Sequence, residues 1–166
     1  MRFTAPRRPS AQHAIAVVIW TMMAMPPILL AQEVVPAYCP DLKRVSELAT
    51  TTERFASISA TPREGNFVNT SLILTGWEDC SLYGPRTYTC DSLSVESVEE
   101  AGQAQQRIFR EVQACLADSW AEAKNRSSVG FIVLQHMRQP VSMTLSTDQT
   151  DRGRYVVRLI LFARSN

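Results

Sequence analysis

The sequence predicts an α+β domain in which an antiparallel sheet of about four strands is packed on one face by two helices, with a disulfide-stapled hairpin. Three observations predict this fold class. Two long segments repeat apolar residues at helical spacing, and the last third of the chain contains apolar runs separated by short turns. In addition, two cysteines bracket a Gly-Pro turn.

Residues 1–31 differ from the rest of the chain and are predicted to be a cleaved secretory signal peptide. Three arginines precede an uncharged apolar run, residues 14–30, and a small residue, Ala31, follows it. An uncleaved membrane anchor is the alternative, but a span needs about 20 apolar residues, and two prolines interrupt this run. Residues 32–166 are therefore expected to form a single globular domain, periplasmic or extracellular, with no stable membrane span.

The charge balance argues against some partners. Removal of the predicted signal peptide would take away three of the 17 basic residues and none of the 16 acidic ones, leaving a net charge of −2. Such a chain has no basic field for nucleic acid or anionic lipid. It also has neither a phosphate-binding glycine loop nor a dinucleotide-binding fingerprint, so no cofactor is expected. The expected partner is an unknown protein or a component of the cell envelope.

The first helix is predicted between Asp41 and Ile58, where apolar residues recur every three or four positions. Asp41 is its candidate N-cap. The segment 66–76, "NFVNTSLILTG", is rich in Val, Thr and Ile and is closed by glycine. It is therefore predicted to be a strand.

The second helix is predicted within residues 91–124. Ser97 and Glu100 match the pattern of a capping box at its start. Eight residues then trace a stripe at helical spacing, which indicates the face turned toward the core. These residues are Val98, Ala101, Gln105, Ile108, Val112, Cys115, Trp120 and Ala123.

Three strands are predicted at the end of the chain. Residues 129–136 are almost continuously apolar, residues 141–146 alternate apolar with polar side chains, and residues 155–163 are long and mostly apolar. The two connections are short and turn-like, which favours an antiparallel meander.

Four cysteines follow the predicted signal peptide, an even number that favours two disulfides in an exported chain. Pro85 lies midway between Cys80 and Cys90, so a hairpin that turns there places them opposite each other, about 4.5–5.5 Å apart at Cα. A disulfide accepts that separation. Elimination then pairs Cys39 with Cys115. No metal site is expected, because this part of the chain has no C-x-x-C motif and contains only one histidine.

The hairpin region also supplies candidate contact residues: Trp77, Tyr83, Arg86 and Tyr88. Aromatic residues and arginine on a rigid projection are typical anchors of a binding surface. The alternative is structural, with Trp77 and one tyrosine covering the disulfide, because aromatic side chains bury large areas.

A catalytic site has weaker support. General acid–base catalysis most often uses histidine, and the only histidine after the predicted signal peptide is His136. It could act with Arg138 or Arg158 in a small nuclease- or esterase-like hydrolase, but a strand-end histidine in contact with solvent is the favoured explanation, because the sequence shows no catalytic partners. There is no G-x-S-x-G nucleophile motif. The leading hypothesis is an exported, non-enzymatic binding protein, with the hydrolase and a structural subunit of a cell-envelope assembly as alternatives.

Overall fold

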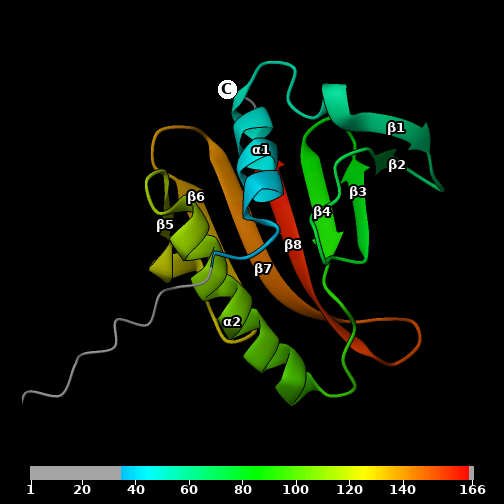
Figure 1. Cartoon of the computed structure of the whole chain (residues 1–166), viewed down its shortest axis with the longest axis vertical. Helices are drawn as coiled ribbons and strands as arrows, with labels where there is room; N and C mark the ends of the chain where they lie inside the picture. Colours follow the sequence, from blue (N-terminus) through cyan, green and yellow to red (C-terminus); the bar gives the residue numbers. More distant parts are fainter. Residues whose placement is uncertain (1–34, 165–166) are drawn as a thin grey trace, which may run out of the picture. The chain divides into compact units, whose positions relative to one another are not determined.

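The computed structural model describes residues 35–164, which contain one antiparallel sheet of eight strands in the order β1-β2-β3-β4-β8-β7-β6-β5 (Figure 1). Two four-stranded meanders, β1–β4 and β5–β8, meet where β4 pairs with β8. The elements are α1 (Cys39–Thr50), β1 (Ser59–Pro62), β2 (Phe67–Thr70), β3 (Asp79–Tyr83), β4 (Thr87–Asp91), α2 (Val98–Leu116), β5 (Trp120–Glu122), β6 (Phe131–His136), β7 (Val141–Gln149) and β8 (Tyr155–Ala163), with 3-10 turns at Ala56–Ile58 and Lys124–Arg126.

The α+β class with an antiparallel sheet and two helices is confirmed, but the expected number of about four strands is wrong. The two edge strands, β1 and β5, contain only four and three residues. Neither is long enough to show a period of two in the sequence. In addition, Trp120 of β5 fits the helical stripe that precedes it, so periodicity assigned it to the helix.

Helix α1 ends at Thr50, earlier than the predicted end at Ile58. The hydroxyls of Thr50 and Thr51 donate to carbonyl oxygens of the last helical turn at 2.7 and 2.8 Å. Threonine hydroxyls that bond to backbone carbonyls compete with the backbone hydrogen bonds of the helix, and this favours the end of the helix here. Phe55 and Ile58 are nevertheless buried, because the chain after the helix folds back onto the core.

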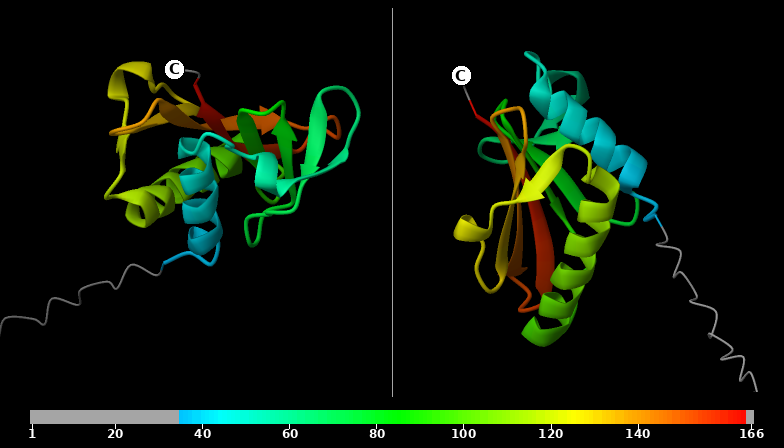
Figure 2. Two further views of the ribbon diagram at one scale, coloured as in Figure 1. Left: turned by 90° about the horizontal axis from the view of Figure 1, so that it is seen from above. Right: turned by 90° about the vertical axis from the view of Figure 1, so that its left-hand side faces the viewer.

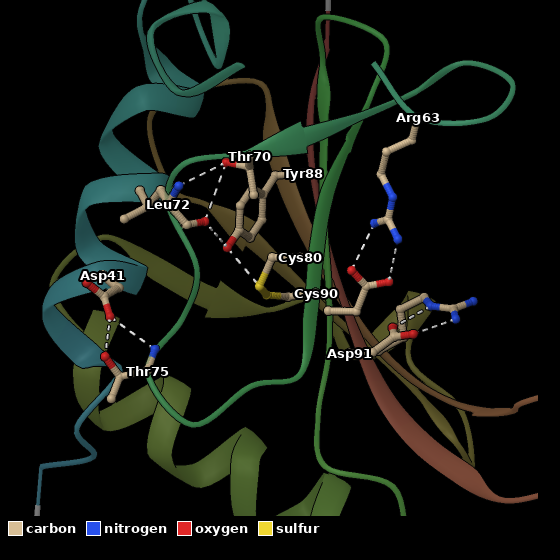
Figure 3. The surroundings of a disulfide bond; sticks show 11 residues. Asp41, Arg63, Thr70, Leu72, Thr75, Cys80, Tyr88, Cys90 and Asp91 are labelled. Atoms are coloured by element: carbon tan, nitrogen blue, oxygen red, sulfur yellow. Dashed lines mark hydrogen bonds and ion pairs between the residues drawn. A yellow bond between two sulfur atoms is a disulfide. The ribbon is translucent and has the colours of Figure 1, made fainter. Parts of the chain in front are cut away.

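Strand β2 covers only the first part of the predicted strand 66–76. The remainder is a loop in which Leu72 and Leu74 are buried between exposed neighbours, a pattern that imitates a strand. The loop is anchored to α1: the Asp41 carboxylate accepts hydrogen bonds from the backbone N–H and the hydroxyl of Thr75 at 3.1 and 2.7 Å (Figure 3). Asp41 therefore lies within the first turn of α1 and does not cap it.

Helix α2 begins as the sequence predicts. The Ser97 hydroxyl accepts from the backbone N–H of Glu100 at 3.2 Å, and the Glu100 carboxylate accepts from the backbone N–H of Ser97 at 3.3 Å. This reciprocal capping box satisfies N–H groups that have no partner inside the helix. The helix ends at Leu116, before the end of the predicted region 91–124, because the chain then enters β5.

Both helices lie on the same face of the sheet, which Figure 2 shows most clearly in its left view. Strand β8 illustrates the consequence for side chains. Its residues Val157, Leu159 and Leu161 are buried in the core that the helices cover, whereas Arg158 and Ile160 alternate with them and lie on the opposite face. Neither α1 nor α2 covers that opposite face.

Two disulfides join the chain in the pairing that the sequence predicts. Cys39 at the start of α1 is bonded to Cys115 near the end of α2, with 5.7 Å between their Cα atoms. Cys80 and Cys90 occupy directly paired positions of β3 and β4 and are bonded to each other (Figure 3). One bond therefore ties the two helices together, and the other ties two central strands together on the helix side of the sheet.

The β3–β4 hairpin has the predicted register. Tyr83 pairs with Thr87, and Leu82 pairs with Tyr88. Gly84 has a φ of 59° in the turn, a left-handed conformation that glycine adopts without a steric penalty.

The predicted signal peptide, residues 1–31, lies outside the described residues. Within residues 35–164, no helix has the length and apolar character needed to cross a membrane.

Candidate functional site

A groove of about 880 Å³ lies on the sheet face that neither helix covers. Residues of β2, β3, β4 and β8 line it, and the turn between β1 and β2 contributes Arg63, Glu64 and Gly65. Gly65 has a φ of 67°, which allows this turn to reverse tightly. Sites for small ligands typically enclose about 300–1,000 Å³, so the groove has the size of a ligand site.

The strand register arranges the groove side chains in three rows that run across the strands. Directly paired residues of antiparallel strands carry their side chains on the same face of the sheet. We call the rows the ionic row (Asp79, Asp91 and Arg158), the hydroxyl row (Ser81 and Thr89, continued by Ile160 and Thr144) and the aromatic row (Phe67 and Tyr83, continued by Thr87 and Phe162).

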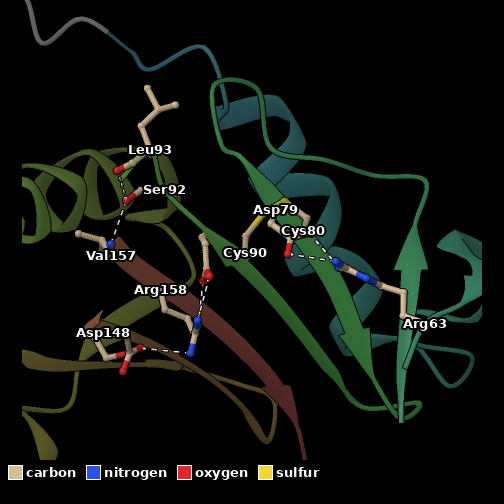
Figure 4. A network of polar contacts seen from close by, with 11 residues as sticks. Arg63, Asp79, Cys80, Cys90, Ser92, Leu93, Asp148, Val157 and Arg158 are labelled. Atoms are coloured by element: carbon tan, nitrogen blue, oxygen red, sulfur yellow. Dashed lines mark hydrogen bonds and ion pairs between the residues drawn. A yellow bond between two sulfur atoms is a disulfide. The ribbon is translucent and has the colours of Figure 1, made fainter. Parts of the chain in front are cut away.

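The ionic row is fixed by two arginine–aspartate pairs (Figure 4). Arg63 donates to both carboxylate oxygens of Asp79 at 2.9 and 3.3 Å. Arg158 donates to both oxygens of Asp91 at 2.7 and 2.8 Å and lies 3.6 Å from Asp148. The hydrogen bonds to Asp79 and Asp91 raise the pKa of each arginine, so both guanidinium groups stay charged. The arginines also offset the repulsion between two aspartates that face each other across β3 and β4.

The hydroxyl row contains a buried side chain whose hydroxyl has no protein partner. Ser81 is only 5% exposed, lines the groove, and makes no side-chain hydrogen bond within residues 35–164. Thr89, directly opposite on β4, is half-buried and also makes none within that range. Within residues 35–164 no fully buried side-chain oxygen or nitrogen lacks a partner, so the Ser81 hydroxyl reaches the surface of the groove, where water or a ligand can bond to it.

The aromatic row begins with two exposed rings. Phe67 and Tyr83 pair across β2 and β3, with ring centroids 5.1 Å apart and planes tilted by 55°. They are 42% and 48% exposed, although both line the groove. Large aromatic surface at the edge of a concave site is a common anchor for ligands.

Two of the four predicted contact residues lie on the surface. Tyr83 lines the groove, and Arg86 is exposed in the β3–β4 turn, where its carbonyl accepts from the backbone N–H of Ala163 at 3.0 Å. The structure adds Phe67 and Arg63 to Tyr83, and sequence reasoning did not single out either residue. They precede the hairpin in the chain and reach the groove only because β2 pairs with β3.

The other two predicted contact residues belong to the core. Trp77 is 8% exposed and packs edge-on against Tyr38, with ring centroids 5.8 Å apart. Tyr88 is fully buried, and its hydroxyl donates to the carbonyl of Leu72 at 3.0 Å (Figure 3). Burial raises the pKa of Tyr88 well above its ordinary value. Both side chains are therefore part of the hydrophobic core and not of the exposed surface.

His136 lies on the helix side of the sheet. Its ring packs edge-on against Trp120 at 5.3 Å, and its Nδ1 accepts from the backbone N–H groups of Arg138 and Gln139, each at 3.1 Å. Burial and the nearby charge of Arg138 lower the pKa of His136. Arg158 lies on the opposite sheet face, so the structure does not bring this arginine together with His136.

Within residues 35–164, no three His, Cys, Asp or Glu side chains are grouped so that they could hold a metal ion. The fold and the groove together define a disulfide-bonded α+β domain whose open sheet face carries a ligand-sized site. Comparison of the chain with protein-family models, with curated proteins and with solved structures found no match.

Proposed function

We propose that the protein is an exported, non-enzymatic binding domain and that the groove on the open sheet face is its binding site. The groove carries this proposal, because it combines ligand-like size with exposed aromatic rings and fixed charged side chains. Export is supported by the two disulfides, since such bonds persist in oxidising compartments.

The groove is also held in place before any ligand arrives. The Cys80–Cys90 bond joins β3 and β4 directly beneath it, and Arg63 and Arg158 are each fixed by two hydrogen bonds to one carboxylate. Side chains that are already ordered lose little conformational entropy on binding. A preorganised surface of this kind favours recognition of a ligand.

The hydrolase alternative has less support. The Nδ1 atom of His136 already accepts two backbone hydrogen bonds, and a proton there would remove both acceptor interactions. The cavity beside His136 measures about 180 Å³, below the usual size of a ligand site.

A structural subunit of a cell-envelope assembly is the second candidate. Phe131 and Phe162 are exposed on β6 and β8, on the same face as the groove. Large exposed apolar side chains on one face are typical of a protein–protein contact. A native mass that corresponds to a complex, measured on the purified protein, would favour this candidate over a monomeric binding domain.

Affinity capture from periplasmic extract or culture medium, followed by mass spectrometry, tests the leading proposal. Wild-type protein should retain a partner that the Tyr83→Ala variant loses, while both keep the same melting temperature because Tyr83 is half exposed. Ile73→Ala is the matched control, since Ile73 is equally exposed but does not line the groove. Equal retention by wild type and Tyr83→Ala, or a loss with Ile73→Ala, contradicts the assignment of the site.

A further inference from the structure

The two arginines that line the groove already have partners, whereas two of its four acidic residues, Glu64 and Asp151, form no ion pair within residues 35–164. Each of the two arginines that line it binds one aspartate through two hydrogen bonds. An anionic ligand would have to compete with Asp79 or Asp91 for an arginine, and Glu64 and Asp151 would repel it. A neutral ligand can use the remaining lone pairs and N–H groups of these pairs without separating them. The groove charges therefore disfavour an anion, and their carboxylate oxygens can accept hydrogen bonds from a neutral ligand rich in hydroxyl groups.

The hydroxyl row matches such a ligand. Ser81 and Thr89 offer hydroxyls that can both donate and accept, and neither makes a side-chain hydrogen bond within residues 35–164. Arg158 and Asp91, in the next row, present a donor and an acceptor side by side. A ligand hydroxyl that donates and accepts at once can be satisfied by this mixed set.

The aromatic row indicates that the ligand also has an apolar face. Phe67 and Tyr83 expose ring surface at the edge of the groove, and Phe162 continues the row on β8. Neighbouring strands lie about 4.8 Å apart, so the row from β2 to β8 spans about 14 Å. That length suits a chain of about three sugar rings, each with a C–H face that packs on an aromatic ring and hydroxyls at its edge.

We infer that the groove binds a neutral oligosaccharide whose C–H faces pack along the aromatic row while its hydroxyls bond to the hydroxyl and ionic rows. This inference rests on the proposed function of the groove as the binding site. It adds the chemical class of the ligand, which follows from the paired arginines, the carboxylates that can accept hydrogen bonds, the hydroxyls without a protein partner and the exposed rings together.

Isothermal titration calorimetry on the disulfide-bonded protein tests this class with defined probes: cellohexaose, chitohexaose and maltohexaose as neutral hexasaccharides, a heparin hexasaccharide as an anion and spermine as a cation. At least one neutral probe should bind, with an affinity that changes little with salt. Tyr83→Ala should weaken that binding by about tenfold. Ser81→Ala should weaken it severalfold, and Ile73→Ala should leave it unchanged. Phe67→Ala replaces Tyr83→Ala as the aromatic variant if the latter fails to fold, as judged by circular dichroism.

The outcomes separate the ligand class from the site. Binding of heparin or spermine in place of the neutral probes overturns the neutral class but leaves the groove as the binding site if Tyr83→Ala abolishes it. Binding of none of the probes overturns the saccharide inference, and the proposed site stands only if capture of a partner depends on Tyr83. Binding of a neutral hexasaccharide that is unaffected by both Tyr83→Ala and Phe67→Ala overturns the inference and the proposed site together.

Discussion

The two disulfides close loops of very different length, and this difference predicts a difference in stability. Cys39 and Cys115 are 76 residues apart in the sequence, whereas Cys80 and Cys90 are only 10 apart. Loop-closure entropy assigns the long bond about 4.5 kcal/mol and the short bond about 2.7 kcal/mol at 25 °C. All four cysteines are buried, so replacement of either pair by alanine removes a similar amount of packing. The difference between the two variants, about 1.8 kcal/mol, therefore reports mainly on loop length.

Urea denaturation of the wild type, Cys39→Ala/Cys115→Ala and Cys80→Ala/Cys90→Ala, followed by circular dichroism, measures this difference. The variant without the long bond should show the lower free energy of unfolding. Wild-type protein unfolded in the presence of reductant is the control, and it should be no more stable than either variant. Equal losses in the two variants, or a larger loss without the short bond, would refute the reasoning from loop length.

Two further predictions concern residues whose environments the structure defines. Tyr88→Phe removes a buried hydroxyl that donates to the Leu72 carbonyl, so the free energy of unfolding should fall by about 1–3 kcal/mol in urea denaturation, and wild-type stability would contradict the role of this bond. Folding lowers the pKa of His136 from its ordinary value of 6.5, so on acidification the unfolded chain is protonated at this residue before the folded protein is. The free energy of unfolding should therefore fall as the pH drops through 6.5 toward the folded pKa. His136→Asn keeps an acceptor but cannot titrate, so its melting temperature should decline less over this pH range, and an equal decline in both proteins would argue against the assignment.

The parts of the fold that local sequence determines could be predicted. The symmetric placement of Cys80 and Cys90 about Pro85 fixed the register of the hairpin and, with it, the disulfide pairing. The Ser97–Glu100 capping box located the start of α2 because both partners lie within one helical turn. Short edge strands and the early end of α1 could not be predicted, since tertiary contacts and side-chain hydrogen bonds decide them.

The candidate site was predicted only in part. Tyr83 was identified because it stands on the hairpin, but much of the groove lining comes from outside the hairpin, from the β1–β2 turn, β2, the β7–β8 turn and β8. A signal was present in the hairpin itself: Asp79, Ser81 and Tyr83 alternate with buried residues and so share the face opposite the disulfide. The contribution of Arg158 could not be foreseen, because it depends on the pairing of β4 with β8, which lie far apart in the sequence.

The pairing of β4 with β8 also affects the order in which the protein can fold. Asp91 and Arg158, which face each other across these strands, are 67 residues apart, and the strand that joins the two meanders is the last one in chain order. Until residues 155–163 have been synthesised, the first meander has no neighbour on its inner side. Non-local strand pairing of this kind slows folding. The groove therefore cannot be completed before the last strand, β8, is available to pair with β4.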